Sequence, residues 1–361
     1  MRVEERNTSA RYYVNAKLEC AKEVSKNDFP DFAKGTDVNE LLTDLIEVNA
    51  KGFRGVVLTA IVGMQINPEY DPLNKFYDCN PRSIFEEGIW YALTDNAIPC
   101  GKSDPLNVAK NINQLDEAWA TGRRPQKAAM AAVRFLRLIV RNKGKRREQL
   151  IDYFFYRLLS YAQSLGDYVL VPAESTGYSN RQLAEKLAQF CLAFPESGNI
   201  PQHLIAKLLE EIFSSSDIEV CGADESVFGT NTTSKKPADI WTELKGQPLN
   251  LYEVTVKKVN LKRLDDCIDA LRSLNSLNMP VTFICRIPED TNGLELCNGV
   301  LNYKGKTFDF IDIRAFVAST SSLLRPEQLA EVIETLEEFV SDINVSKKTK
   351  EGWNSIFGNN K

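Results

Sequence analysis

The sequence predicts an α/β fold of the α+β kind, with a mainly helical first part and a layered second part of helices and strands. Apolar residues before about residue 196 recur mostly at helical spacing. The segments after it follow the order helix, three strands, helix, strand, which is typical of a layered domain. The 361 residues are enough for two domains, and we expect them at residues 1–196 and 197–361.

The composition excludes several classes of protein. The net charge is −5, so any binding of nucleic acid must depend on a local concentration of Lys and Arg. Eight cysteines occur without a C-x-x-C pair and His203 is the single histidine, so we expect neither a zinc site nor a disulfide framework. The start, Met1–Arg6, has no apolar signal region, and the longest apolar run, Gly55–Met64, is too short to cross a bilayer. We therefore expect a cytoplasmic protein that does not associate with a membrane.

Helices dominate the expected elements of the first part. Asp37–Glu40 offers an acid that can cap a helix, and leucines follow at helical spacing from Leu41. Gly55–Val62 is continuously apolar, so it is a buried segment whose identity as helix or strand stays open. Further expected features are a helix start at Pro81, a helix over 149–165, a short strand over 168–172, a helix over 180–194 and a linker at 195–198.

Residues 123–147 form a strongly basic stretch in an acidic chain. The stretch holds ten Lys or Arg residues and no acid. Its alanine-rich residues 128–132 favour a helix on which Arg134, Arg137 and Arg141 share one face. Such a local field is typical of a surface that contacts a phosphate backbone. The alternative is a solvated face that pairs with acids from elsewhere in the chain.

Gly101-Lys102-Ser103 matches the end of a phosphate-binding loop. The upstream glycine of that motif is missing, however, and Pro105 would interrupt the helix that must follow. We therefore expect no nucleotide cofactor.

The second part starts with an expected helix over 201–213 and a short strand over 218–221. After a polar loop over 222–236 come two hairpin strands, near 238–244 and 250–259, joined by the turn Lys245–Pro248. The remaining expected elements are a helix over 261–274, a strand over 280–285, a strand near 308–313 and a helix over 326–339.

Asp239, Glu253 and Lys257 are the candidate catalytic residues, because the hairpin brings them toward one patch. Strand alternation puts Glu253, Thr255 and Lys257 on one face, opposite the apolar one. Two carboxylates and an ammonium group suit metal-assisted attack on a phosphodiester. Glu253 and Lys257 are separated by about 13 Å of extended strand, so one metal site needs Lys257 to bend back or a bulge to shorten the gap. The alternative is that these are ordinary charges at the rim of a sheet.

The hairpin resembles the PD-(D/E)xK nuclease motif, with two departures. Ala238 separates Pro237 from Asp239, and Thr255 stands where the motif has an acid two residues before the lysine. Glu253-Val254 with Lys257 is similar to the Glu-Val-x-x-Lys pattern of the SacI family of type II restriction endonucleases. Two loops, Asn80–Ile84 and Cys100–Asn107, resemble that family's N-terminal region, and the order and separations of these blocks agree over residues 78–257.

The resemblance implies a PD-(D/E)xK restriction-endonuclease-like core and a homodimeric, Mg²⁺-dependent enzyme of a restriction-modification system. Such an enzyme cuts both strands of a specific double-stranded DNA site and leaves 5′ phosphates. Asp239 and Glu253 would bind the metal, and Lys257 would act on the attacking water or the phosphate charge. Glu210 or Glu211, on the preceding helix, would add a further ligand or support the site.

The DNA contacts implied by the same reading fall in the first part. Arg82, Ser83, Lys102 and Asn107 occupy the matched loops and are candidates for reading bases, with helix capping and loop closure as the rival explanation. The basic stretch would contact phosphates, which sets affinity and register without reading sequence. Its candidate contacts are Arg123, Arg124, Arg134, Arg137 and Arg141.

Three other functions stay open. The chain could bind DNA without cutting it, with the sheet as a scaffold. A nuclease of repair or recombination would recognise DNA structure instead of sequence. A protein-interaction module is favoured if the basic helix is buried and Asp239 points into the core.

Overall fold

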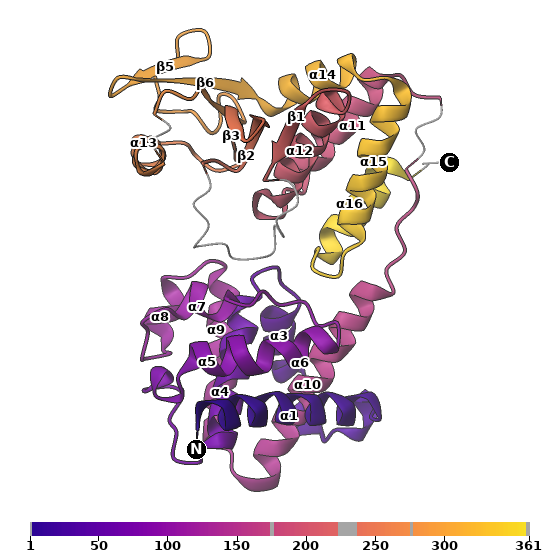
Figure 1. Cartoon of the computed structure of the whole chain (residues 1–361). Helices are drawn as coiled ribbons and strands as arrows, with labels where there is room; N and C mark the ends of the chain where they lie inside the picture. Colours follow the sequence, from indigo (N-terminus) through magenta and orange to yellow (C-terminus); the bar gives the residue numbers. More distant parts are fainter. Residues whose placement is uncertain (1, 174–176, 223–236, 275–276, 359–361) are drawn as a thin grey trace. The chain divides into compact units, whose positions relative to one another are not determined.

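The computed structural model describes residues 2–173, 177–222, 237–274 and 277–358 (Figure 1). The chain divides into two compact units, residues 1–168 and 169–361. This division comes earlier than the expected boundary at residue 196. The expected polar loop over 222–236 lies outside the described residues, apart from Gly222.

Unit 1, the first 168 residues, is helical throughout its described part. Its core gathers apolar side chains from the long helices α1, α4, α9 and α10 and from the shorter ones around them. The helices are α1 (Val3–Lys22), α2 (Asp31–Lys34), α3 (Thr36–Ile46), α4 (Gly52–Ile66), α5 (Pro81–Ile84), α6 (Trp90–Asp95), α7 (Asp104–Ala109), α8 (Glu117–Thr121), α9 (Gln126–Arg141) and α10 (Gly144–Gly166).

The apolar run Gly55–Val62, whose identity as helix or strand the sequence left open, lies within helix α4. The run is helical, and every residue in it is buried, so helix α4 is apolar on all sides because other helices surround it. Gly55 permits the close approach of α7, since a Cβ there would stand 2.6 Å from Cγ of Pro105. The helix expected over 149–165 is confirmed within α10.

Unit 2, residues 169–361, is a layered α/β structure, as expected. Its six strands form one mixed sheet in the order β1-β2-β3-β4-β6-β5. Strands β1, β2 and β3 pair antiparallel, β3, β4 and β6 pair parallel, and β5 returns antiparallel to β6. The elements are α11 (Asn180–Ala193), α12 (Asn199–Phe213), β1 (Ile218–Cys221), β2 (Ile240–Leu244), β3 (Gln247–Val254), α13 (Leu261–Ser273), β4 (Val281–Cys285), β5 (Val300–Tyr303), β6 (Lys306–Asp312), α14 (Ile313–Leu323), α15 (Pro326–Ser341) and α16 (Lys347–Phe357).

Helices cover both faces of this sheet. Ile284 of β4 packs with α11, α12 and α14–α16 on one face, whereas its neighbour Phe283 packs against α13 on the other. The alternation of side chains along a strand thus distributes one apolar segment between two cores. Figure 1 shows α13 apart from α11 and α12, with the sheet strands between them. The helices and strands expected after residue 200 are confirmed in kind and order, with the hairpin strands shorter than expected.

Two expectations near the unit boundary are wrong. Residues 168–172 form no strand, and instead the Val171 carbonyl accepts a hydrogen bond from Nε1 of Trp353 at 3.1 Å. The expected linker at 195–198 is a tight reversal between α11 and α12. Its Glu196 is buried, and the Ser346 amide donates to it at 3.1 Å at the start of α16. Turn residues are needed here because both helices belong to one core.

In the described part of the chain, every helix is too short or too polar to cross a membrane.

Candidate active site

Strand pairing in the hairpin brings Asp239 and Glu253 together. Ile240, the first residue of β2, lies opposite Tyr252 of β3, so Asp239 and Glu253 are the next residues along the two neighbouring chains. Oδ2 of Asp239 accepts a hydrogen bond from the Val254 amide at 3.0 Å, which extends the pairing past the end of β2. The carboxylate of Asp239 is thereby tied to the strand that carries Glu253.

The two acids line one small open pocket of about 240 Å³. Tyr252 and Val254 pack with α12 and its neighbours, so Glu253 points to the opposite face of β3, as alternation predicts. The pocket is lined by Gln202, Pro237, Ala238, Asp239, Glu253, Cys267 and Ala270. Both acids therefore face a space that solvent or a ligand reaches, and neither is enclosed in the apolar core.

Glu253 is electrostatically strained. Its side chain is 19% exposed, and burial, reinforced by the neighbouring Asp239 carboxylate, raises the pKa of Glu253 from 4.5 to about 7. Two carboxylates that share a pocket resist simultaneous ionisation unless a cation joins them. The Cys267 thiol in the same pocket stays protonated at neutral pH, because burial and the nearby Glu253 raise the pKa of Cys267 to about 12.

Arg263, which was not a candidate in the sequence analysis, is a cation in direct contact with Glu253. Its Nη2 lies 3.3 Å from Oε2 of Glu253, and its Nη1 donates to Oγ1 of Thr255 at 2.8 Å. The guanidinium opposes the effect of burial on the pKa of Glu253. Arg263 lies on α13, in the chain segment that follows the hairpin, so only the docking of that helix brings it here. The signal in the sequence that could have identified Arg263 is its place as a basic residue at the start of an amphipathic helix.

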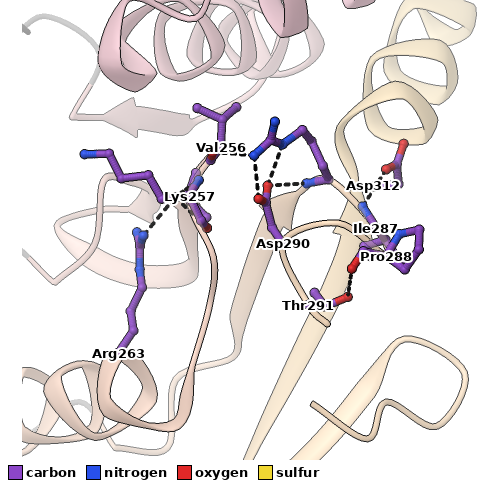
Figure 2. Close-up of polar contacts among 10 residues, drawn as sticks. Val256, Lys257, Arg263, Ile287, Pro288, Asp290, Thr291 and Asp312 are labelled. Carbon is purple, nitrogen blue, oxygen red and sulfur yellow. Dashed lines mark hydrogen bonds and ion pairs between the residues drawn. The ribbon is translucent and has the colours of Figure 1, made fainter. Parts of the chain in front are cut away.

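The expectation that β3 continues through Lys257 is wrong. The strand ends at Val254, and Oγ1 of Thr255 accepts the Lys257 amide at 3.0 Å, which turns the chain. Glu253 and Lys257 therefore do not share one strand face. Lys257 is exposed, and its side chain extends away from the loop in Figure 2; among the described residues it does not line the pocket of the two acids. The bulge in this hairpin lies at Thr242/Glu243, at the other end of β2.

Helix α12 contributes Gln202 to the pocket, and not the two glutamates expected from it. The side-chain amide of Gln202 donates to the Asp239 carbonyl at 3.3 Å. Glu210 is two helical turns further on, about 12 Å along the axis, and pairs with Lys207 at 2.7 Å. The Glu211 carbonyl accepts a hydrogen bond from Gln328. Neither glutamate is among the described residues that line the pocket.

The four candidates for reading bases lie in unit 1 and have different local roles. Ser83 exchanges hydrogen bonds with Asn7 at 3.0 and 3.2 Å. Arg82 lies 3.7 Å from Glu86 and is 64% exposed. Lys102 lies 3.2 Å from Glu87 and over the rings of Trp90 and Tyr91, whereas Asn107 is exposed on α7.

The loop around Gly101 is shaped by its own side chains. The Asp104 carboxylate accepts the Gly101 amide at 2.6 Å, which closes the turn that begins α7. This loop closure accounts for Gly101-Lys102-Ser103 without a bound phosphate. Contact of the four candidates with bases stays a prediction.

The basic stretch is partly neutralised by acids from neighbouring helices. Arg137 pairs with Glu117 of α8 at 2.5 Å, and Lys127 pairs with Asp44 of α3 at 2.8 Å. Arg147 bonds three carbonyls at the end of α9, so it caps that helix.

Four of the predicted phosphate contacts in this stretch show no ion pair in the described part of the chain. Arg134 and Arg141 are exposed on α9. Arg124 donates to the Arg123 carbonyl, and Arg123 itself lies over the Trp119 ring. Contact of the stretch with DNA stays a prediction.

The described residues contain no cluster of three or more His, Cys, Asp or Glu side chains that could hold a metal ion. Asp239 and Glu253 are the two acids among the described residues that line the pocket. Compared with models of known protein families and with curated proteins, the sequence matches none.

Proposed function

We propose that the protein is a metal-dependent endonuclease that cuts both strands of duplex DNA, of the type II restriction class. The observation that carries the proposal is the pairing of Asp239 and Glu253 in one open pocket at the end of the β2–β3 hairpin. Paired acids in a pocket, one of them with a strongly raised pKa, are typical of functional sites because folding places charge there at an energetic cost.

The order of elements supports the same proposal. Helix α12, strands β1–β3, helix α13 and strand β4 follow one another, and β4 joins the antiparallel hairpin in parallel. A PD-(D/E)xK-like core has this order, with one acid at the start of the second strand and another on the third. Asp239 and Glu253 stand at those two places. By the same resemblance, we propose that the protein acts as a homodimer.

The donor set fits Mg²⁺. Carboxylate oxygens are the protein ligands that this ion prefers, and it commonly takes one or two of them while water and substrate phosphate complete its shell. The Val254 amide holds the Asp239 carboxylate through Oδ2, and both Asp239 and Glu253 line the same pocket. When bound there, the ion would neutralise both acids and lower the pKa of a water molecule beside the scissile phosphate.

The side chains of the pocket would have different roles in the reaction. Asp239 and Glu253 fix where the reaction occurs, because both are held by the hairpin. Arg263, within contact of Glu253, would stabilise the negative charge that builds on the phosphoryl oxygens. Water attacks phosphorus, the bond to the 3′ oxygen breaks, and the products are a 3′ hydroxyl and a 5′ phosphate. The catalytic role expected of Lys257 stays a prediction, and the geometry favours Arg263 for it.

Incubation with plasmid DNA tests the proposal. We expect discrete fragments with Mg²⁺ and none with EDTA, and Asp239→Asn or Glu253→Gln should reduce cleavage at least about 100-fold, since metal ligation contributes several kcal/mol to the transition state. Glu334→Gln, an exposed acid of α15, is the matched control and should cut like the wild type. Equal activity of all four proteins would refute the assignment of the site.

A second candidate is a DNA-binding protein without cleavage. The Arg263–Glu253 ion pair favours it, because this pair gives the half-buried Glu253 a structural partner. Binding without nicking on diverse unmethylated DNA would support this candidate. Sequencing the fragment ends separates the restriction class from a repair nuclease, since only the former produces ends that share one sequence.

A further inference from the structure

We propose that residues 257–263, the basic segment between β3 and α13, bind the phosphodiester backbone of duplex DNA beside the two-acid pocket. The inference rests on the proposed function and deepens it, because the sequence placed every backbone contact in unit 1. The segment carries Lys257, Lys258, Lys262 and Arg263 within seven residues.

The three lysines are exposed, and within the described ranges no acid pairs with any of them. In the basic stretch of unit 1, Lys127 and Arg137 each have an acid within ion-pair distance, whereas Arg134 and Arg141 are exposed and show no ion pair among the described residues. The lysines of residues 257–263 are of the second kind, and they follow the strand that carries Glu253. A cation that already pairs with an acid adds little binding free energy when it contacts a phosphate. An unpaired surface cation adds more, because its contact with DNA releases counterions.

The segment is also held in place, so its charges are fixed before any ligand arrives. Oγ1 of Thr255 accepts both the Lys257 amide at 3.0 Å and the Arg263 guanidinium at 2.8 Å. The Val259 amide donates to the Asp290 carbonyl at 2.8 Å. The backbone is thereby tied to α13 on one side and to the segment after β4 on the other.

Arg286 makes the shortest of the hydrogen bonds that hold this segment. Its Nη2 donates to the Val256 carbonyl at 2.6 Å, and the same guanidinium holds Asp290 through Nε at 2.8 Å and Nη2 at 2.6 Å. Figure 2 draws bonds to the Asp290 carboxylate as dashed lines, and the Lys257 side chain points away from them. The side chain of Asp290 is 3% exposed and that of Arg286 is 38% exposed, so burial shields the carboxylate while solvent still reaches the guanidinium. Arg286 and Asp290 are therefore positioning residues for the basic segment.

The location of the segment identifies the ligand class. Lys257 is four residues from Glu253, so its backbone lies at most about 13 Å from that acid. The start of α13, capped by Asn260, adds the positive end of a thirteen-residue helix. The nearest acid along the first turns, Asp265, pairs with Lys304 at 2.5 Å. If the scissile phosphate of a DNA strand lies at Asp239 and Glu253, the neighbouring phosphates of that DNA strand would thus lie close to the three lysines.

Binding to a fluorescent duplex of mixed sequence, followed by anisotropy in EDTA over a series of salt concentrations, tests the proposal without cleavage. The triple variant Lys257→Ala/Lys258→Ala/Lys262→Ala should flatten the slope of log K against log salt by about 2.7, which is about 0.9 per phosphate contact. That slope corresponds to a loss of roughly 8-fold in affinity per lysine at about 0.1 M salt. The control Lys245→Ala/Lys347→Ala/Lys348→Ala removes the same charge from exposed positions of unit 2 and should keep the wild-type slope.

Equal slopes for the two triple variants overturn the inference, whether or not the enzyme cuts DNA. Binding through the segment without any Mg²⁺-dependent cleavage would instead overturn the proposed function and leave the inference standing. Absence of wild-type binding to the duplex at low salt would refute both.

The positioning role has its own readout. Arg286→Ala should speed hydrogen exchange at the Val259 amide more than at the amides of β4, and Arg286→Lys should restore part of the protection. In a double-mutant cycle with Lys257→Ala, the two losses of DNA affinity should be less than additive, because Arg286 acts through Lys257. Full additivity, or unchanged exchange at Val259, overturns the positioning role.

Discussion

Replacing Glu253 with Gln should stabilise unit 2 at alkaline pH while it abolishes the proposed activity. The physical reason is the cost of holding a charge at this position. Burial and the Asp239 carboxylate raise the pKa of Glu253 from 4.5 to about 7. Each pKa unit corresponds to about 1.4 kcal/mol, so the ionised side chain costs up to about 3 kcal/mol of folding free energy.

The sign of the pH dependence follows from linkage. Above pH 7 Glu253 is ionised in the folded and the unfolded chain, and the whole cost is present. As the pH falls through 7 the folded form takes up a proton, and below about pH 4.5 both forms are protonated and the cost is gone. Glutamine resembles the neutral acid at every pH. The gain from Glu253→Gln should therefore be largest at pH 8 and vanish near pH 4.

Urea denaturation at pH 8, 6 and 4.5 without divalent ions measures the effect, with hydrogen exchange in β3 and β4 reporting unit 2 separately from unit 1. We expect a gain of about 1–3 kcal/mol at pH 8, and the pKa of about 7 from which it follows already includes the opposing effect of Arg263. The exposed control Glu334→Gln should stay within about 0.5 kcal/mol at each pH. A Glu253→Gln protein that is less stable than wild type at pH 8 would show that the Arg263 ion pair outweighs the burial of charge.

Three further predictions follow from contacts in the two units. In thermal denaturation, Mg²⁺ at about 100 times its Kd should stabilise the wild type by about 2.7 kcal/mol. The same Mg²⁺ should leave the stability of Asp239→Asn unchanged. An equal shift in both proteins would show that the two acids are not the metal site. Phe283→Ala empties a fully buried position between the sheet and α13, so hydrogen exchange should show a loss of about 3–5 kcal/mol in unit 2 with unit 1 unaffected. Gly55→Ala places a Cβ 2.6 Å from Pro105 and should cost unit 1 about 1–3 kcal/mol in the same experiment; a neutral result would show that α7 shifts freely.

The sequence predicted most elements of unit 2, though not β5, α14 and α16, because the signals of the predicted ones are local. The β-branched run of β3 and the apolar stripe of α13 each depend on residues within one turn or strand. The hairpin also placed Asp239 beside Glu253, because pairing across a short turn has few alternatives. What failed were features set by contacts from far along the chain, such as the buried Glu196 in an apparent linker, whose partner is Ser346.

The end of β3 shows the limit of pattern reading most clearly. Residues 250–259 alternate well enough to continue a strand through Lys257. Thr255 instead bonds the Lys257 amide, and Arg286 takes the Val256 carbonyl, so side chains replace the ladder that a longer strand would need. The competing partner, Arg286, lies after β4, and no local pattern reveals that it reaches this loop.

Helix α13 connects the core of unit 2 to the chemistry of the pocket. Leu264, Ile268 and Leu271 bury one stripe of the helix against the sheet. The residues that face the acids, Arg263, Cys267 and Ala270, occupy the adjacent stripe with the same spacing. The apolar stripe therefore fixes the rotation at which Arg263 meets Glu253, and a helix turned by one residue would present Lys262 or Leu264 there instead. It follows that the apolar packing of α13 against the sheet determines which side chain reaches the two acids. A substitution in the apolar stripe could therefore move Arg263 away from Glu253 without altering any charged residue.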